Sequence, residues 1–366
     1  MSWTSILLPV LAFLLMLPMD TIAQNAISVG SRRASTTITT TATYQRYEDD
    51  GTYFEQVSLP VTVAVPVGRE FGFVLRAAPA LARGRELDQI SGVGDVQLGS
   101  TYSRVVGPLS LVASVRANLP SGKSTLNPEE FQTSSTLSKH YYDFEVPIFG
   151  QGVNVGPGLV VAIPISPSLV VGLGAAYQYK SPFQPRTIFE GDYDPGDELV
   201  LTGGLDARIS ESSRVSADLT LTQYQDDTVD GSVVISSGDR IGITALLQSF
   251  IGRDEFAVVA SHRRKASSSV PAGALRTTPG EVSSIPNKTE LQLSYGIHIS
   301  DATAFGLLVA GRFFGETDSF ESRTILNVGV APRHRLSNKL MLATGFGYAF
   351  GSVTGLEARF GLRLTP

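Results

Sequence analysis

The sequence predicts an all-β protein, a transmembrane up-and-down antiparallel β-barrel of about 16 strands, with about 12–14 strands as the alternative. Three observations predict this fold. Apolar and polar residues alternate with a period of two along many segments. Short and long links alternate between those segments. Aromatic residues gather where the segments enter the long links.

The alternation is clearest between residues 109 and 119. The odd positions there are all apolar, whereas the even positions include Arg116 and Asn118. A period of two indicates a strand with one apolar and one polar face. The same alternation recurs over residues 199–209, 215–221, 291–299 and 356–364. No stretch of the chain shows a comparable period of 3.6, so helices are not expected to carry the fold.

The links between the expected strands fall into two classes. The short ones cover residues 66–70, 105–108, 165–168, 209–213, 252–255, 300–302 and 336–339. The long, polar ones cover residues 82–91, 121–146, 181–197, 225–239 and 266–288. Such asymmetry is typical of outer-membrane barrels, which have tight periplasmic turns and longer external loops.

Aromatic residues supply a third signal. The expected external girdle consists of Tyr44, Tyr177, Tyr179, Tyr224, Phe313, Phe314, Tyr348 and Phe350. A thinner periplasmic girdle is expected from Phe71, Phe256 and Phe305. Both belts are features of membrane barrels. Ordinary β-propensity also favours aromatic residues in strands, but it does not predict their gathering at one end.

The composition excludes several classes of protein. The chain has no cysteine, which excludes a lipoprotein anchor, a disulfide framework and a thiolate metal site. A net charge of −5 with 17% charged residues gives no sign of a nucleic-acid surface. The mean hydropathy of +0.10 is high for an exported protein, which must bury its apolar surface or show it to lipid. A soluble β-sandwich or a secreted solenoid is the alternative architecture.

The start of the chain suits export. Residues 6–17 form an apolar run that is too short to span a bilayer but fits a secretory signal. We expect a signal peptide at 1–23, a short periplasmic segment at 24–34 and the barrel at 35–366. A short membrane anchor is the alternative interpretation of the run.

The stretch ANLPSGKS, residues 117–124, is one residue short of a phosphate-binding P-loop. A P-loop lies between a buried strand and a helix. Here the preceding strand alternates in polarity, and the following residues contain Pro128 without apolar periodicity. We therefore expect no helix and no nucleotide site, but a strand that leaves the membrane and turns into a large loop.

The same region resembles a known family. Residues 92–99 (GVGDVQLG), Tyr102 and residues 118–123 (NLPSGK) are similar to the Gly-Leu-Gly-Asp and Leu-Pro-Thr-Gly-Lys segments of the outer-membrane family named for the MetA pathway of phenol degradation. Residues 58–75, 150–158 and 172–177 extend the resemblance over roughly residues 55–180. It implies an outer-membrane channel for small organic or aromatic compounds. The chain departs from barrels that end on an aromatic residue, since its last residue is Pro366.

Polar residues of the expected strands should face the lumen, because a charge turned toward lipid costs about 2–4 kcal/mol at the bilayer midplane. The predicted pore-lining residues are Asp95, Gln97, Arg116, Asn118, Asp206, Arg208, Arg214, Asp218, His298, Arg312, Arg323, Glu357, Arg359 and Arg363. Arginines facing carboxylates across a pore would select among solutes. Alternatively, these side chains pair and simply brace the interior. Any constriction is expected from the loops, above all from residues 121–149.

Three loop features have two interpretations each. Gly-Asp recurs at residues 94–95, 196–197 and 238–239, either as a loop-to-strand turn or as a cation site. The acidic residues 192–198 are either a solvated loop or a calcium site. Near the outer leaflet, Arg263, Arg264 and Lys265 either bind lipopolysaccharide phosphates or form a solvated cap.

The expected function is passive or facilitated diffusion of small solutes, including aromatic or other organic compounds, across the outer membrane. Its partners would be outer-membrane lipid, lipopolysaccharide, the barrel-assembly machinery and the solute, with no nucleic acid, cofactor or metal. A non-conducting scaffold or adhesin that works through its external loops is the main alternative. A hydrolase at the rim is another, for which His140 beside Ser138 and Asp143 is the candidate constellation.

Overall fold

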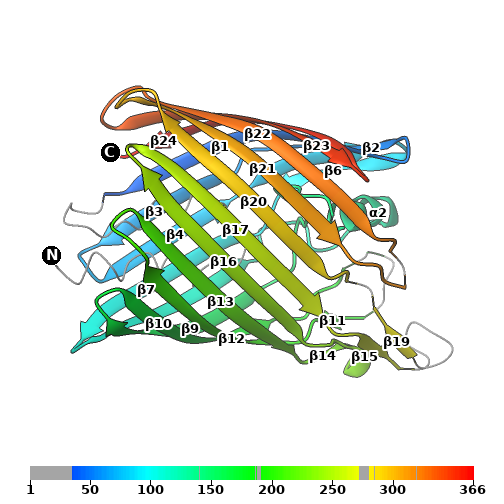
Figure 1. The fold of residues 1–366 in the computed structure, drawn as a ribbon. Helices are drawn as coiled ribbons and strands as arrows, with labels where there is room; N and C mark the ends of the chain where they lie inside the picture. Colours follow the sequence, from blue (N-terminus) through cyan, green and yellow to red (C-terminus); the bar gives the residue numbers. More distant parts are fainter. Residues whose placement is uncertain are drawn as a thin grey trace.

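The strands of the computed structural model form one closed antiparallel barrel (Figure 1). The structure describes residues 35–139, 141–185, 187, 191–271, 280–283, 285–318 and 320–366. The expected signal peptide and N-terminal segment lie outside these residues. No helix in the described part of the chain is long and apolar enough to cross a bilayer.

The barrel has sixteen strands, as the sequence predicted. Most are continuous: β1 (Thr37–Asp49), β8 (Leu109–Leu119), β9 (Asn154–Ser166), β10 (Leu169–Lys180), β12 (Glu198–Arg208), β13 (Ser213–Tyr224), β16 (Arg240–Ile251), β17 (Asp254–Lys265), β20 (Lys288–His298), β21 (Thr303–Phe314), β22 (Arg323–Arg335), β23 (Leu340–Gly351) and β24 (Thr354–Leu364). Three are each broken in two: β2 (Thr52–Ser58) with β3 (Val61–Val67), β4 (Phe71–Ala77) with β5 (Pro79–Gly84), and β6 (Leu87–Val93) with β7 (Val96–Val106).

The three breaks lie side by side. Pro60 and Pro79 stand at the first two and lack the N–H that a continuous ladder needs. The chain is bridged across them by backbone bonds from Leu59 N to Pro79 O and from Gly94 N to Ala78 O, both 2.9 Å. The two halves of each broken strand therefore stay in one sheet.

The first and last strands close the barrel. Their antiparallel ladder runs from Ile38 opposite Leu364 to Glu48 opposite Thr354. Closure pairs the edges that an open sheet would leave free, which is what a strand structure needs in order to sit in lipid.

The register assigns every barrel side chain to one face, because directly paired residues point to the same side. The outward set is mostly apolar and well exposed; Leu173, Leu219 and Phe346 are 57%, 51% and 60% exposed. A soluble protein does not display such a continuous apolar belt. The closed barrel and this belt place the protein in the outer membrane.

The aromatic residues follow the expectation with two exceptions. Of the expected external girdle, Tyr44, Tyr177, Tyr179, Phe313, Tyr348 and Phe350 are on the outward face. Tyr224 and Phe314 are on the lumenal face, so their assignment to the girdle was wrong. Strand alternation requires this, because Tyr224 is three positions after the outward Leu221 and Phe314 directly follows the outward Phe313. Phe71, Phe256 and Phe305 point outward.

The two ends of the barrel differ. The C-terminus and the expected short turns lie at one end, and α2, β11, β14, β15 and β19 lie at the other, the long-loop end (Figure 1). Residues 82–91, expected as a long loop, are instead β5, a tight turn and β6. Glu86 supports that turn with a positive φ of 61°. Parts of the other long links form a second sheet of β11 (Tyr193–Asp194), β14 (Asp226–Val229), β15 (Ser232–Ser236), β18 (Ser268–Val270) and β19 (Gly280–Val282).

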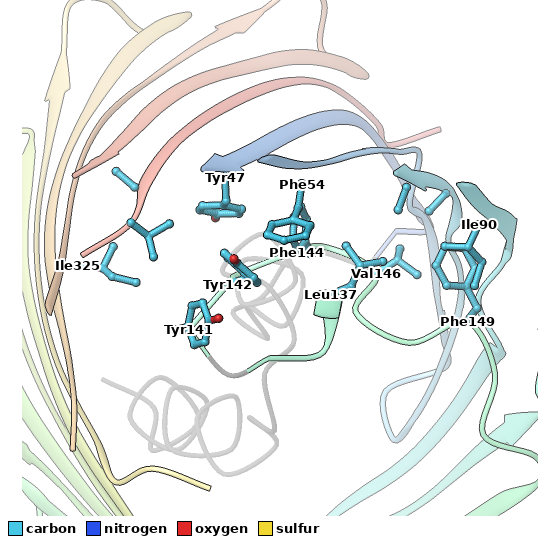
Figure 2. Packing of buried hydrophobic residues seen from close by; sticks show 14 of the residues in the cluster. Tyr47, Phe54, Ile90, Leu137, Tyr141, Tyr142, Phe144, Val146, Phe149 and Ile325 are labelled. Carbon is cyan, nitrogen blue, oxygen red and sulfur yellow. The ribbon is translucent and has the colours of Figure 1, made fainter. Parts of the chain in front are cut away.

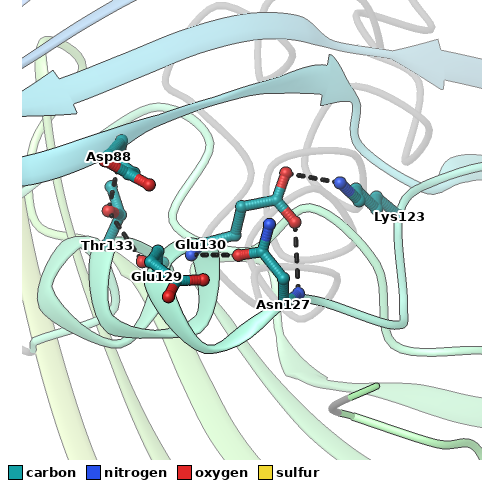
Figure 3. A network of polar contacts seen from close by, with 6 residues as sticks. All are labelled: Asp88, Lys123, Asn127, Glu129, Glu130 and Thr133. Atoms are coloured by element: carbon teal, nitrogen blue, oxygen red, sulfur yellow. Dashed lines mark hydrogen bonds and ion pairs between the residues drawn. The ribbon is translucent and has the colours of Figure 1, made fainter. Parts of the chain in front are cut away.

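The connection between β8 and β9, residues 120–153, folds into the barrel and is called the inner loop below. It contains a helix, α2 (Pro128–Leu137), which the sequence analysis did not expect. Asn127 caps the helix and exchanges bonds with Glu130, while Pro128 occupies the first turn (Figure 3). Apolar periodicity missed it because its buried face is mostly small and polar, with Thr133, Ser134 and Thr136 beside Leu137.

Candidate functional site

The inner loop packs against the lumenal wall over β1, β2, β5 and β6 (Figure 2). Tyr47 and Phe54, directly opposite each other on β1 and β2, give the wall side of a buried apolar cluster. The inner loop supplies Leu137, Tyr141, Tyr142, Phe144, Val146 and Phe149. The ring of Tyr47 meets that of Phe144 edge-on with centroids 5.1 Å apart. Apolar burial thus holds the loop to one side of the lumen.

Two glutamines fix the same loop by its backbone. Gln45 donates from Nε2 to Asp143 O at 2.5 Å and accepts at Oε1 from Glu145 N at 2.7 Å. Gln56 donates to Val146 O at 2.8 Å and accepts from Val146 N at 2.9 Å. Both amide side chains are at most 1% exposed. They satisfy buried backbone groups that would otherwise cost about 1–3 kcal/mol each.

Ion pairs extend the attachment to both sides of the closing ladder. Glu145 of the loop meets Arg76 on β4 at 2.5 Å. Asp143 meets Arg312 on β21 at 3.6 Å. Tyr141 and Tyr142 donate from their hydroxyls to Asp49, each at 3.3 Å, and the same carboxylate accepts from Arg323 at 2.7 Å.

The base of the inner loop is closely packed and contains the P-loop-like stretch, residues 117–124. Asp95 accepts from Gly122 N at 2.8 Å, Gln151 N at 2.7 Å and Asn118 Nδ2 at 2.7 Å. A Cβ on Gly122 would lie 1.8 Å from Phe149 O, so only glycine fits this crossing. Two amides of the P-loop-like stretch are already bonded, that of Ser121 to Leu119 O and that of Gly122 to Asp95.

Lys123, the lysine of the P-loop-like stretch, forms an ion pair with Glu130 of α2 (Figure 3). Burial opposes ionisation of Glu130, but the ammonium of Lys123 and the amide of Asn127 outweigh it and lower the pKa of the carboxyl. Enclosure likewise opposes the charge on Asp143, yet Arg312, Lys288 and Arg359 hold its pKa below the usual value. Burial raises the pKa of Tyr142, so it stays a neutral donor.

The predicted pore-lining residues share one face. The register places the following on the lumenal side: Gln97, Arg116, Asn118, Asp206, Arg208, Arg214, Asp218, His298, Arg312, Arg323, Glu357, Arg359 and Arg363. Asp95 stands in the break between β6 and β7 and anchors the inner loop. That these residues line a conducting path stays a prediction.

Several of these residues have partners within the barrel. Arg359 and Glu357 pair at 2.5 Å, and Gln45 donates to Glu357 at 3.1 Å. The ring of His298 lies 3.9 Å from Asp254, which also accepts from its backbone N–H at 2.9 Å. Asp206 and Asp218 lie on neighbouring strands of the same face, since Asp206 is opposite Ser216 and Gly204 is opposite Asp218.

The three basic residues at the end of β17 are not on the same face of the barrel. Arg263 and Lys265 face the lumen, and only Arg264 faces outward. Strand alternation makes this unavoidable, because successive side chains point to opposite faces. The lipopolysaccharide hypothesis therefore narrows from three residues to Arg264.

The lumenal wall carries a basic group that the sequence analysis did not identify. Lys265 lies 4.7 Å from the ring centroid of Tyr224, Arg240 lies 5.8 Å from it and Lys180 lies 6.0 Å from it. Lys180 and Arg240 stand at strand ends, just outside the links 181–197 and 225–239, and the sequence analysis assigned them no role. An alignment of neighbouring strands that kept track of the lumenal positions would have shown that these basic residues lie together.

Among the described residues, the structure does not bring together those of the hydrolase hypothesis or of the metal-site hypotheses. His140 lies outside the described residues, while Ser138 donates to Ser135 O and Asp143 faces Arg312. Within the described ranges, no group of three or more His, Asp or Glu side chains could hold a metal ion. Two of the Gly-Asp carboxylates accept hydrogen bonds from distant parts of the chain: Asp95 anchors the inner loop, and Asp197 accepts from Lys180 N at 2.9 Å and from the hydroxyl of Tyr177.

Comparisons with known proteins find solved structures that are similar to this chain only at low sequence identity. No protein-family model matches it, and no curated protein matches its sequence. A bacterial polysaccharide outer membrane secretin superposes with a TM-score of 0.48 and 8% identity, over 91% of this chain and 98% of that one. OccK5 of Pseudomonas aeruginosa gives 0.47 and 11%, over 90% and 97%. The CymD monoaromatic hydrocarbon channel gives 0.45 and 12%, over 91% and 88%.

Proposed function

We propose that the barrel is an outer-membrane channel for passive or facilitated diffusion of small solutes. The observation that carries the proposal is the chemistry of its inner face. Charged and polar side chains line the wall from end to end, instead of the apolar core that would fill a solid barrel. A sixteen-strand barrel is of the size that holds a water-filled channel in porins.

The inner loop is the constriction of this channel. It occupies one side of the lumen and is bonded to the wall through backbone, ion pairs and aromatic packing. A loop held in this way narrows the passage permanently instead of opening and closing with each solute. Selectivity would then depend on the charges that face it.

Aromatic or other small organic compounds are the proposed solutes. The support is the resemblance of residues 55–180 to the family named for the MetA pathway of phenol degradation. That assignment remains part of the proposal, because no family model matches the chain. Contact of Arg264 with lipopolysaccharide phosphates and insertion by the barrel-assembly machinery belong to the same proposal.

Single-channel conductance tests the function. Mature protein is refolded, its folding is checked by heat-modifiable gel mobility, and it is then inserted into a planar lipid bilayer. Discrete open steps that small aromatic acids block would support a channel. A folded barrel without conductance would reject it and favour a scaffold that works through the sheet of β11, β14, β15, β18 and β19.

A further inference from the structure

The lumenal face of β16, β17 and β20 concentrates positive charge in a way that strand pairing normally avoids. Arg240 is directly opposite Lys265, and Arg263 is directly opposite Lys288. Like charges at directly opposed positions destabilise a sheet. We call Arg240, Arg263, Lys265 and Lys288 the basic wall.

The nearby carboxylates are already engaged. Glu198 bonds Lys180 at 2.7 Å, and Glu290 bonds Lys288 at 2.6 Å. Asp227 on β14 accepts from Tyr193 and from Gly196 N. Among the residues that the structure describes, Arg240, Arg263 and Lys265 form no direct ion pair with an acidic side chain, because the carboxylates near them are bonded to other groups.

The contacts that these three cations do make are to uncharged groups. Arg240 donates to Thr222 Oγ1 at 3.3 Å, and Lys265 lies over the ring of Tyr224. The Nε of Arg263 is buried and has no hydrogen-bond partner in the described part of the chain. A buried donor without a partner costs free energy unless a ligand satisfies it.

The basic wall lies where a solute would enter the lumen. In the circular strand order, β16 is eight strands away from the β2/β3 strand in both directions around the sixteen. Arg240 on β16 therefore lies across the lumen from the β2/β3 strand that holds the inner loop, whereas Lys288 on β20 is closer to Asp143 of that loop. All four cations lie at the strand ends next to the long-loop end, where a solute would enter from outside.

We propose that the basic wall is a binding site for the oxyanion of a small solute, a carboxylate or a phosphate, at the entrance of the lumen. The proposal rests on the channel function and names the class of solute that the channel admits. Arg263 would donate from Nε and its terminal nitrogens, and Lys265 and Arg240 would neutralise the anion from either side. The ring of Tyr224 beneath the cations offers a planar apolar surface to the body of an aromatic acid.

Ligand-observed fluorine NMR of the folded protein in detergent micelles tests the site without requiring conductance. The probe is 4-fluorobenzoate, and its uncharged counterpart is 4-fluorobenzyl alcohol. The test variant combines Arg240→Gln, Arg263→Gln and Lys265→Gln. The matched control is Arg264→Gln, which removes the adjacent positive charge from the outward face. Inorganic phosphate and succinate are added as competitors to separate phosphate from carboxylate solutes.

The wild type and Arg264→Gln should bind the benzoate, and the triple variant should bind it at least about tenfold more weakly. Binding should also weaken in 1 M salt, where the Debye length falls to about 3 Å. Removal of opposed like charges should leave the triple variant as resistant to denaturant as the wild type, or more so. Loss of binding together with loss of stability would instead indicate a structural role and would overturn the proposal.

The two proposals fail in different ways. Equal binding of the benzoate and the alcohol, or unchanged binding by the triple variant, would reject the anion site even if the protein conducts. Benzoate binding by the basic wall in a barrel that shows no conductance would reject the channel and keep the site.

Discussion

Gln45 and Gln56 lie directly opposite each other in the ladder between β1 and β2, and each exchanges two hydrogen bonds with the backbone of the same loop. The barrel wall thus pairs with the backbone of residues 143–146 as a neighbouring strand would, but through side-chain amides. This pair is the most specific attachment of the inner loop.

Gln56→Ala should therefore loosen the inner loop without preventing the barrel from closing. The change leaves the N–H and C=O of Val146 without their partner, at a cost of about 1–3 kcal/mol for each group that stays buried. We expect larger fluctuations of single-channel current and faster cleavage within residues 120–153 by added protease. Gln292→Ala is the control, because Gln292 is lumenal and lies opposite Ala310. Equal effects of the two variants would show that the Gln56 bonds do not hold the loop.

Leu219→Arg should destabilise the barrel in membranes. Leu219 lies in the middle of β13, faces outward and is 51% exposed, so the new charge would enter the bilayer at a cost of about 2–4 kcal/mol. Thr220→Arg places the same residue one position along, on the lumenal face. We expect denaturant unfolding from lipid vesicles at a clearly lower midpoint for Leu219→Arg alone. A similar loss in both variants would contradict the assignment of faces.

Protection of α2 should depend on pH through Glu130. Its pKa is lowered in the folded protein, so the stabilisation is present above the usual pKa of a glutamate, about 4.3, and is lost as the pH falls through the lowered value. Hydrogen exchange of residues 127–138, corrected for intrinsic rates, should show this loss in the wild type. Glu130→Gln should be less protected at neutral pH and should respond little to acid.

Glu129→Gln provides the comparison for the helix. Glu129 is in the same first turn, but Lys123 and Asn127 bond to Glu130. This variant should keep the pH response of the wild type. If it loses the response as Glu130→Gln does, general charge at the helix N-terminus would be the cause instead of the specific contacts.

Gly122→Ala should displace the base of the inner loop. The added Cβ would meet Phe149 O at 1.8 Å, and relief of that clash breaks the bond from Gly122 N to Asp95. Overpacking of this kind costs about 1–3 kcal/mol. Gly242→Ala is the matched control, since nothing lies within 4 Å of the position of its Cβ. Denaturation midpoints should fall for Gly122→Ala and stay near the wild type for Gly242→Ala.

The barrel was predictable from the sequence because its strands alternate between apolar outward and polar lumenal residues along most of their length. Residues 109–119 were expected as a strand from alternation alone, and β8 has the same bounds. Lipid imposes this regularity, since outward side chains at the depth of the hydrocarbon must be apolar and each backbone group there must be paired.

The interior was predictable only in part. Alternation assigns Arg116 or Glu357 to the lumenal face, but it does not say which lumenal residues meet. The inner loop is fixed by contacts between residues far apart in the chain, such as Gln56 with Val146. The helix α2 buries small polar residues, so no hydrophobic period marks it. The basic wall depends on the register of three strands, which no single segment contains.

The inner loop also contributes to the closure of the barrel. The ladder that closes the barrel joins β1 to β24, strands from the two ends of the described chain. A segment from its middle reaches both sides of that ladder, through Gln45 on β1 and Arg312 on β21. The contacts of the inner loop therefore join strands that are far apart in the chain and neighbours in the closed barrel. They add to the stability of the closed state, because they are complete only when the two ends of the described chain have come together.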